Sequence, residues 1–252
     1  MDQLYDSALE MMDQAFGSLS RRVGELEVRA MGDGYVFRYK EKSIYQAIVQ
    51  KLARVVTSLR AIRLLNSAGF LQEQAALQRT LDEFDEDIAF LCFAIIFRDF
   101  TPLHKEYLAA FYEEEFDVPE SAIESTQKRP MTSRKKIRAF VSRDRGTGYG
   151  QSTTIEAVRT LSKTYSGYVH GASPQLMEMY YGNPPYFHLR HAIDSPFYKD
   201  HTEDLLNNYY RGILSFAFAA KAFDEGVLFD RIRIFASEFA VASGREDQLR
   251  ER

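Results

Sequence analysis

The chain has 252 residues, of which 45% are hydrophobic and 27% are charged, so it is long enough to bury a substantial core. Its 36 acidic and 32 basic residues exclude a general attraction to nucleic acid or anionic membranes, and they restrict such binding to local patches. The single cysteine, Cys92, excludes an internal disulfide framework and a cysteine-based metal site, and it indicates a reducing, cytoplasmic compartment.

The N-terminal segment MDQLYDSALEMMDQ is acidic and amphipathic, unlike a signal peptide. The longest apolar run, residues 88–97, is about half of the ~20 residues that a membrane-spanning helix needs. We therefore expect a protein without membrane contact, in which this run is part of a buried core helix.

Apolar residues spaced alternately by four and three positions predict two long helices in succession. The first covers about residues 43–65, with the apolar face Ile48, Leu52, Val55, Leu59 and Ile62. The second covers about residues 71–97, with the apolar face Leu77, Leu81, Phe84, Ile88, Leu91 and Ile95. Because Gly69 suits the end of a helix, we expect a long antiparallel helical hairpin.

Thr101 and Pro102 predict the N-cap and first position of a third helix. Residues 115–152 then pass from an acidic to a basic run, which predicts a charged, partly mobile connector. Within it we expect one short helix at residues 134–141 and a capping box formed by Asp117 and Glu120.

The remaining chain also has helical periodicity. Thr153 and Glu156 predict the start of a helix that ends at Gly171. Further helices are expected from Ser173 to Tyr180, from a cap at Asp200 or Thr202 to about Phe223, and over about residues 228–242, with an irregular segment at 181–197. Only residues 34–40 resemble a strand. The chain should thus be a single all-α domain, residues 1–252, folded as a helical bundle.

The segment LQRTLDEFDED, residues 77–87, carries the first candidate site. Arg79 and Glu83 lie one turn apart on the side opposite the apolar face, and the same side becomes apolar at Phe90. A helix that is apolar all round is covered all round, so this helix should be central, with one end in water. The pair is either part of a functional site or an ordinary surface ion pair.

The segment TYSGYVHGAS carries the second candidate. Ser166 and His170 share the polar side of their helix with Arg159 and Lys163. His170 could act as a general acid or base or contact a phosphate, with Ser166 beside it. It could equally cap the C-terminus of the helix, where the helix dipole favours an imidazolium.

The L-x-R-x-L-x-E helix at residues 77–83 and the Y-S-G-Y-V-H-G motif at 165–171 together resemble an uncharacterised bacterial family near the HEPN superfamily. Helical domains of that superfamily occur in prokaryotic toxin–antitoxin, CRISPR and abortive-infection systems. The resemblance covers about residues 44–173. It implies a helical bundle, often dimeric, with a polar site in a groove between helices. It also implies that Arg79, Glu83 and His170 act together, with Ser166 beside them, on RNA or nucleotides.

Many HEPN nucleases share an arginine followed by a polar residue and, five to seven positions after the arginine, a histidine. The segment RDFTPLH is similar, with Arg98, Asp99 and His104. The resemblance implies that His104 polarises a ribose 2′-hydroxyl while Arg98 steadies the phosphate, in a scission that needs no metal.

A basic stretch could bind a phosphate backbone, or it could be a solvated linker. Its candidate contacts are Lys128, Arg129, Arg134, Lys135, Lys136 and Arg138. His188, His191 and His201 could be metal ligands, but the prolines around the first two favour a structural loop, so we expect neither a metal nor a cofactor.

Two main hypotheses result. The first is a HEPN-like, homodimeric protein that binds or cleaves RNA or nucleotides, in phage defence or a toxin–antitoxin system. The second is a non-catalytic protein-interaction module, and a bundle that binds a small molecule in an aromatic pocket is a third alternative. The first hypothesis expects Arg79 and His170 to converge in a cleft. The second expects them apart, with an exposed apolar patch elsewhere.

Overall fold

A computed structural model of the chain describes residues 1–114, 130–143 and 165–244. The predicted capping boxes at Asp117–Glu120 and Thr153–Glu156 lie outside these residues, as do Lys128 and Arg129. The described part is mostly helical, which confirms the predicted fold class. None of its helices is both long enough and apolar enough to cross a membrane.

The helices are α1 (Asp2–Ser20), α2 (Ile44–Ser67), α3 (Leu71–Ile96), α4 (Pro102–Tyr112), α5 (Arg134–Val141), α7 (Ser173–Met177), α8 (Tyr198–Ala222) and α9 (Gly226–Ala242). The strands are β1 (Leu26–Met31), β2 (Gly34–Tyr39), β3 (Tyr180–Tyr181) and β4 (Tyr186–Phe187). The strand β1 pairs with β2, and β3 pairs with β4, each pair as a two-stranded antiparallel hairpin.

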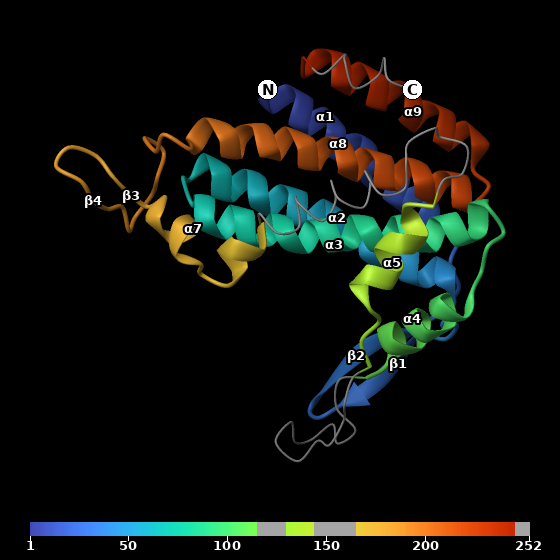
Figure 1. Ribbon diagram of the computed structural model, residues 1–252. Coiled ribbons are helices and arrows are strands. Elements are labelled where there is room, and N and C mark those ends of the chain that lie inside the picture. The colour runs from blue at the N-terminus through green and yellow to red at the C-terminus, as the bar shows by residue number, and fades with distance from the viewer. Residues whose placement is uncertain (115–129, 144–164, 245–252) are drawn as a thin grey trace.

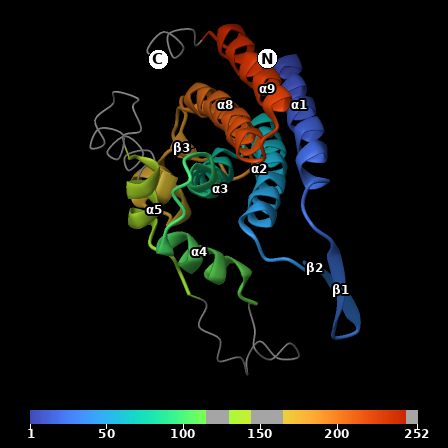
Figure 2. The same ribbon diagram turned by 90° about the vertical axis from the view of Figure 1, so that its right-hand side faces the viewer.

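Three long helices form the centre of the bundle. The helices α2, α3 and α8 pack against one another, α1 and α9 cover α8, and α5 lies on α3 (Figure 1). Seen from the side, the β1–β2 hairpin projects from the end of α2, away from the helical layers (Figure 2). The apolar core therefore lies between α1, α2, α3, α8 and α9, and the hairpin stands at its margin.

The predicted apolar face of α2 is confirmed, because all five of its residues are completely buried. The helix ends at a three-residue connection in which Gly69 has a positive φ of 76°. A Cβ on this glycine would lie 2.8 Å from Ile193, and the Gly69 carbonyl accepts a hydrogen bond from the Ala192 backbone. The glycine thus permits both the turn from α2 into α3 and the close approach of residues 192–193.

Helix α3 occupies the predicted central position. Leu81, Ile88 and Leu91 of its expected apolar face are completely buried, and so is Phe90 on the other side. Four acidic residues in the middle of the helix are also buried, namely Asp82, Asp85, Glu86 and Asp87. We call these four residues the acidic ladder. The sequence analysis did not predict that they are buried.

Other boundaries differ modestly from the expectations. Helix α5 has the predicted limits, whereas the helix that begins at Ser173 ends at Met177 and α8 begins at Tyr198. The segment expected to be irregular contains the β3–β4 hairpin. The strand predicted near residues 34–40 exists as β2, but its partner β1 was missed.

A substitution of Gly212 in α8 tests the packing of the core. A Cβ at this position would lie 2.8 Å from Leu59 of α2 and 3.6 Å from Met12 of α1. We expect Gly212→Val to reduce the free energy of unfolding by about 1–3 kcal/mol through overpacking. Chemical denaturation measures the change. Gly17→Ala in α1 is the control, because its Cβ meets nothing closer than 3.6 Å, and it should leave stability equal or raise it by up to ~1 kcal/mol. Equal losses in the two variants would contradict the packing described here.

Candidate functional site

A line of polar side chains runs along the interface of α3 and α8. On α3 it consists of Gln74, Gln78, Asp82 and Asp85, and on α8 of His201, Asn208, Arg211 and Ser215. Steps of three, four or seven positions place each set on one face of its helix. Apart from Arg211, all of these residues are buried. We call this set the polar seam.

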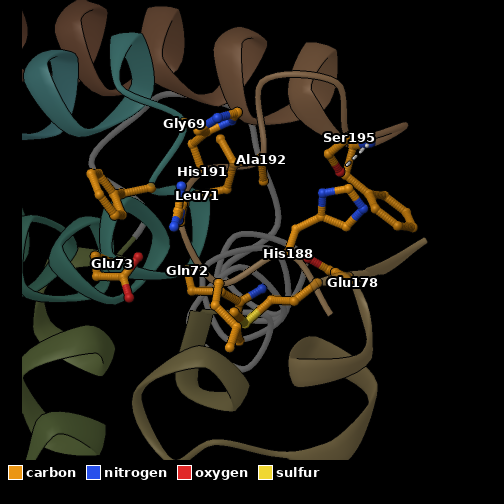
Figure 3. Close-up of a pocket in the computed structure, with 14 residues that line it drawn as sticks. Gly69, Leu71, Gln72, Glu73, Glu178, His188, His191, Ala192 and Ser195 are labelled. Atoms are coloured by element: carbon orange, nitrogen blue, oxygen red, sulfur yellow. Dashed lines mark hydrogen bonds between the residues drawn. The ribbon is translucent and has the colours of Figure 1, made fainter. Parts of the chain in front are cut away.

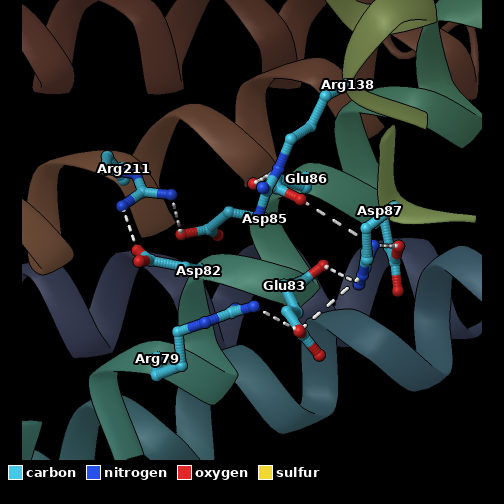
Figure 4. A network of polar contacts seen from close by, with 9 residues as sticks. Arg79, Asp82, Glu83, Asp85, Glu86, Asp87, Arg138 and Arg211 are labelled. Atoms are coloured by element: carbon cyan, nitrogen blue, oxygen red, sulfur yellow. Dashed lines mark hydrogen bonds and ion pairs between the residues drawn. The ribbon is translucent and has the colours of Figure 1, made fainter. Parts of the chain in front are cut away.

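At both ends of the seam, direct contacts join α3 to α8. The Gln74 amide donates to the His201 carbonyl at 2.8 Å. At the other end, Arg211 donates to Asp82, and its second terminal nitrogen lies 3.7 Å from Asp85 (Figure 4). Ser215 also donates to Asp85, at 2.7 Å. The seam thereby ties the two central helices together by polar contacts as well as by apolar packing.

Several buried polar atoms of the seam have no hydrogen-bond partner within the described chain. They are both amide atoms of Gln78, Asn208 Oδ1, Asp85 Oδ2 and His201 Nδ1. Most of them are acceptors. Buried polar groups normally find a partner, so these positions are suited to ordered water or to the donor groups of a ligand.

Burial shifts the ionisation of the carboxylates in this region. It raises the pKa of Asp85 to about 6, although Arg211 and Ser215 act in the opposite direction. Burial likewise raises the pKa of Asp82 and of Glu86. Perturbed carboxylates are common in functional sites, and they also occur in structural ion-pair networks.

The rest of the acidic ladder is neutralised from α2 and α5. Lys51 Nζ of α2 lies 2.6 Å from an Asp87 oxygen, and both side chains are buried. Arg138 of α5 donates to Glu86 at 2.8 Å, while Arg134 donates to Asp87 and to the Glu83 carbonyl. Two of the cations expected to contact nucleic acid, Arg134 and Arg138, thus attach α5 to α3. Their neighbours Lys135 and Lys136 are exposed.

The structure brings together only part of the site predicted from the two motifs. Arg79 Nη2 lies 2.7 Å from Glu83 Oε1, and Arg79 Nη1 is buried without a hydrogen-bond partner. Ser166 is half-buried and His170 is exposed, at the end of a helical turn closed by Gly171 with a φ of 61°. In the described part of the chain, no hydrogen bond or ion pair joins Ser166 or His170 to the Arg79–Glu83 pair. Their joint action stays a prediction.

In the RDFTPLH motif, His104 has a structural role. The His104 side chain is completely buried and stacks on Phe90, with ring centroids 3.9 Å apart. Its Nδ1 accepts the Thr101 backbone N–H at 3.0 Å, and its Nε2 lies 3.3 Å from the Phe90 carbonyl. Both ring nitrogens are therefore engaged, and burial lowers the pKa of His104. Arg98, two residues beyond the end of α3 with a φ of 53°, is exposed and makes no hydrogen bond with this ring among the described residues.

The histidines considered as metal ligands also have local roles. His188 stacks on Tyr181 at 3.6 Å within the β3–β4 hairpin, and His201 lies 3.6 Å from Glu178. A cavity of about 70 Å³ between the start of α3 and residues 178–197 contains His188 and His191 (Figure 3). It has room for a few water molecules. Within the residues that the structure describes, no group of three or more His, Cys, Asp or Glu side chains is arranged so that it could hold a metal ion.

No family model matches the sequence, and neither a curated protein nor a solved structure matches it. The function must therefore be inferred from the geometry of the chain itself. The residues that sequence reasoning missed, chiefly Asp82, Asp85 and Arg211, did leave a signal. Polar residues at helical spacing lie among the apolar residues of two long helices, and such a pattern on both partners indicates a buried polar interface.

Asp85 makes the stability of the bundle depend on pH. Its pKa rises from 3.8 to about 6 on folding, so the folded state binds this proton more tightly than the unfolded chain does. The stabilisation is complete below about pH 4 and is lost as the pH rises through about 6. Denaturation across this range should show Asp85→Asn gaining stability relative to the wild type, by up to about 1.4 kcal/mol per pH unit.

Asp13→Asn controls for the removal of one exposed carboxylate, since Asp13 pairs with Arg60 at the surface. A stability difference between Asp85→Asn and wild type that stays constant from pH 4 to pH 7 would show that Asp85 is already ionised in the folded state at the lower end of this range.

Proposed function

We propose that this chain is a protein-interaction protein that binds its partner through the β1–β2 hairpin. The supporting observation is one apolar face of this hairpin. The strand register pairs Leu26 with Tyr39, Val28 with Phe37 and Ala30 with Tyr35, and alternation places all six side chains on the same face. Soluble proteins rarely expose a contiguous apolar surface that has no binding role.

The exposed fractions of these side chains are large: 63% for Val28, 66% for Tyr35 and 56% for Phe37. The opposite face of the hairpin is charged, and Arg38 on that face forms an ion pair with Glu114 at 2.8 Å. The two faces thus differ as in a sheet that is covered on one side. Such a pattern favours a partner of matching apolar character.

A groove of about 290 Å³ continues the apolar face toward the end of α4. Phe37 and Tyr39 of the hairpin and Phe111 and Tyr112 of α4 line it. Aromatic side chains of this kind supply much of the binding energy in protein interfaces. The groove gives a partner a concave, aromatic contact beside the flat face of the hairpin.

The surroundings of the other candidates also favour this function. The nitrogens of His104 are engaged inside the core, and Arg134 and Arg138 are paired with the acidic ladder. These groups have structural partners, whereas Val28, Tyr35 and Phe37 of the hairpin face are largely exposed. The contrast supports the hypothesis of an interaction module.

A photo-crosslinking amino acid in place of Phe37 tests this function in the native cell. We expect crosslinks from position 37 to one defined polypeptide, identified by mass spectrometry of the joined peptides, because a bound partner would cover this face. The same amino acid in place of Leu64, which is 69% exposed on α2, is the control and should not yield that adduct. Identical adducts from the two positions, or none from either, would contradict the proposal.

Binding of RNA or nucleotides, as the HEPN resemblance implies, is a second candidate function. The observation that favours it is a groove of about 510 Å³ between α4 and α5, with Lys136 and Arg143 in its lining. Lys135 is exposed on the same short helix. Exposed cations beside a groove are suited to a phosphate backbone.

For this second function, Lys135→Glu/Lys136→Glu should weaken binding of a single-stranded RNA about tenfold or more at low salt and make it less salt-dependent. Fluorescence anisotropy with a labelled oligonucleotide measures the affinity. Lys199→Glu is the matched control, because Lys199 is an exposed lysine of α8 whose side chain is 85% accessible. An equal effect of both changes would indicate only general electrostatic attraction, and cleavage that is lost in His170→Ala would extend the function to catalysis.

A further inference from the structure

The outer edge of β1 is a second feature of the hairpin. Within the residues described, β1 pairs with β2 alone, and five of its six residues are exposed while β2 is partly covered. The strand contains no proline, lysine or bulge, which often protect a free edge, and its two charged residues, Glu27 and Arg29, are of opposite sign. An exposed edge of this length is a template for a further strand whose charges complement those of β1.

The register determines which backbone groups face this edge. Glu25 and Lys40 form a hydrogen-bonded pair, because the Lys40 N–H donates to the Glu25 carbonyl at 3.0 Å. Hydrogen-bonded and non-hydrogen-bonded pairs alternate along an antiparallel ladder, so Glu27, Arg29 and Met31 also bond to β2. The N–H and C=O groups of Leu26, Val28 and Ala30 consequently point outward from the edge.

The sequence of β1, LEVRAM, is complementary to itself in one antiparallel register. With the two-fold axis at Val28, each Val28 exchanges backbone hydrogen bonds with its counterpart, and Leu26 pairs with Ala30 of the other copy. All outward groups of these three residues then gain partners. In the same register, Glu27 of each copy lies opposite Arg29 of the other, in the closely spaced kind of cross-strand pair.

Other registers lack this match. An axis at Glu27 or at Arg29 would oppose two like charges and would pair only two of the three outward-facing residues with one another. Pairing through β2 with an axis at Phe37 would set Val36 opposite Arg38, with no opposite charge. The register centred on Val28 therefore stands out by charge and by backbone hydrogen bonding together.

Such pairing also extends the apolar face of the hairpin. Leu26, Val28 and Ala30 of both copies would meet at the centre of a four-stranded sheet, with Phe37 and Tyr39 of each copy on the flanks. An isolated two-stranded hairpin is only marginally stable in water, whereas four strands with a shared apolar face are more stable. A second copy would supply the two further strands that the isolated hairpin lacks.

We infer that two copies of this chain associate through antiparallel pairing of their β1 strands about Val28, held in register by reciprocal Glu27–Arg29 ion pairs. The inference rests on the proposed role of the hairpin as an interaction surface, and it places a second copy at the β1 edge, which leaves the joined apolar face of the two hairpins open to a further partner. The dimer is symmetric, because the same strand contributes to both sides of the contact.

Sedimentation equilibrium of the full chain and of charge-exchanged variants tests the inference. Wild type should be a dimer, and Glu27→Arg or Arg29→Glu alone should raise the dissociation constant about tenfold or more, because each change opposes like charges at two symmetric positions. The double variant Glu27→Arg/Arg29→Glu should restore dimerisation. An equimolar mixture of the two single variants should form a heterodimer, since one carries only basic and the other only acidic residues at these positions.

This mixing experiment also distinguishes a specific effect from a misfolded hairpin, because a damaged hairpin would not be rescued by the complementary variant. Val28→Pro is a further check. It removes an outward N–H but no bond to β2, and it should abolish dimerisation without loss of helical circular dichroism.

A monomeric wild type at every accessible concentration would overturn the inference, and so would single variants that dimerise as well as the wild type. Its failure is distinguishable from that of the proposed function. If position 37 crosslinks to a different protein while the purified chain is monomeric, the hairpin is an interaction surface whose partner is not a second copy.

Discussion

The burial of four carboxylates in the middle of one helix is the constraint on which the rest of this structure depends. A buried carboxylate without a counter-charge is strongly destabilising, so the acidic ladder of α3 requires cations from its neighbours. Lys51 comes from α2, Arg134 and Arg138 from α5, and Arg211 from α8. These contacts specify which helices surround α3 and where along it they lie. They also explain how a helix as short as α5 keeps a defined position, with Ile137 and Phe140 as its buried apolar residues.

The helices were largely predictable, because apolar periodicity and end signals are local properties. The buried face of α2, the turn at Gly69 and the limits of α5 all follow from residues close together in sequence. The acidic ladder was not predictable in this way. Whether Asp82 is buried depends on Arg211, which lies 129 positions away, and a run of acids without known partners is normally a solvated surface.

The candidate sites show the same division between local and distant information. The spacing of Arg98 and His104 matches a catalytic motif, but the stack on Phe90 and the bonds of both ring nitrogens determine what this histidine does. The strand β1 is different, since its signal was present. In LEVRAM, Leu26, Val28 and Ala30 alternate with Glu27 and Arg29, a period of two that is typical of a strand with one apolar face.

The distance in sequence between the ladder and its counter-charge on α8 has a consequence for biosynthesis. At ribosomal rates of about 5–20 residues per second, Arg211 is polymerised roughly ten seconds after Asp82. During this interval the nascent α3 cannot bury its carboxylates against α8, so they stay hydrated or pair only with Lys51 and the arginines of α5. The carboxylates of the central helix α3 therefore gain their full set of counter-charges late, although α3 is translated early. A chain released by the ribosome before α8 would lack the charge that closes its core.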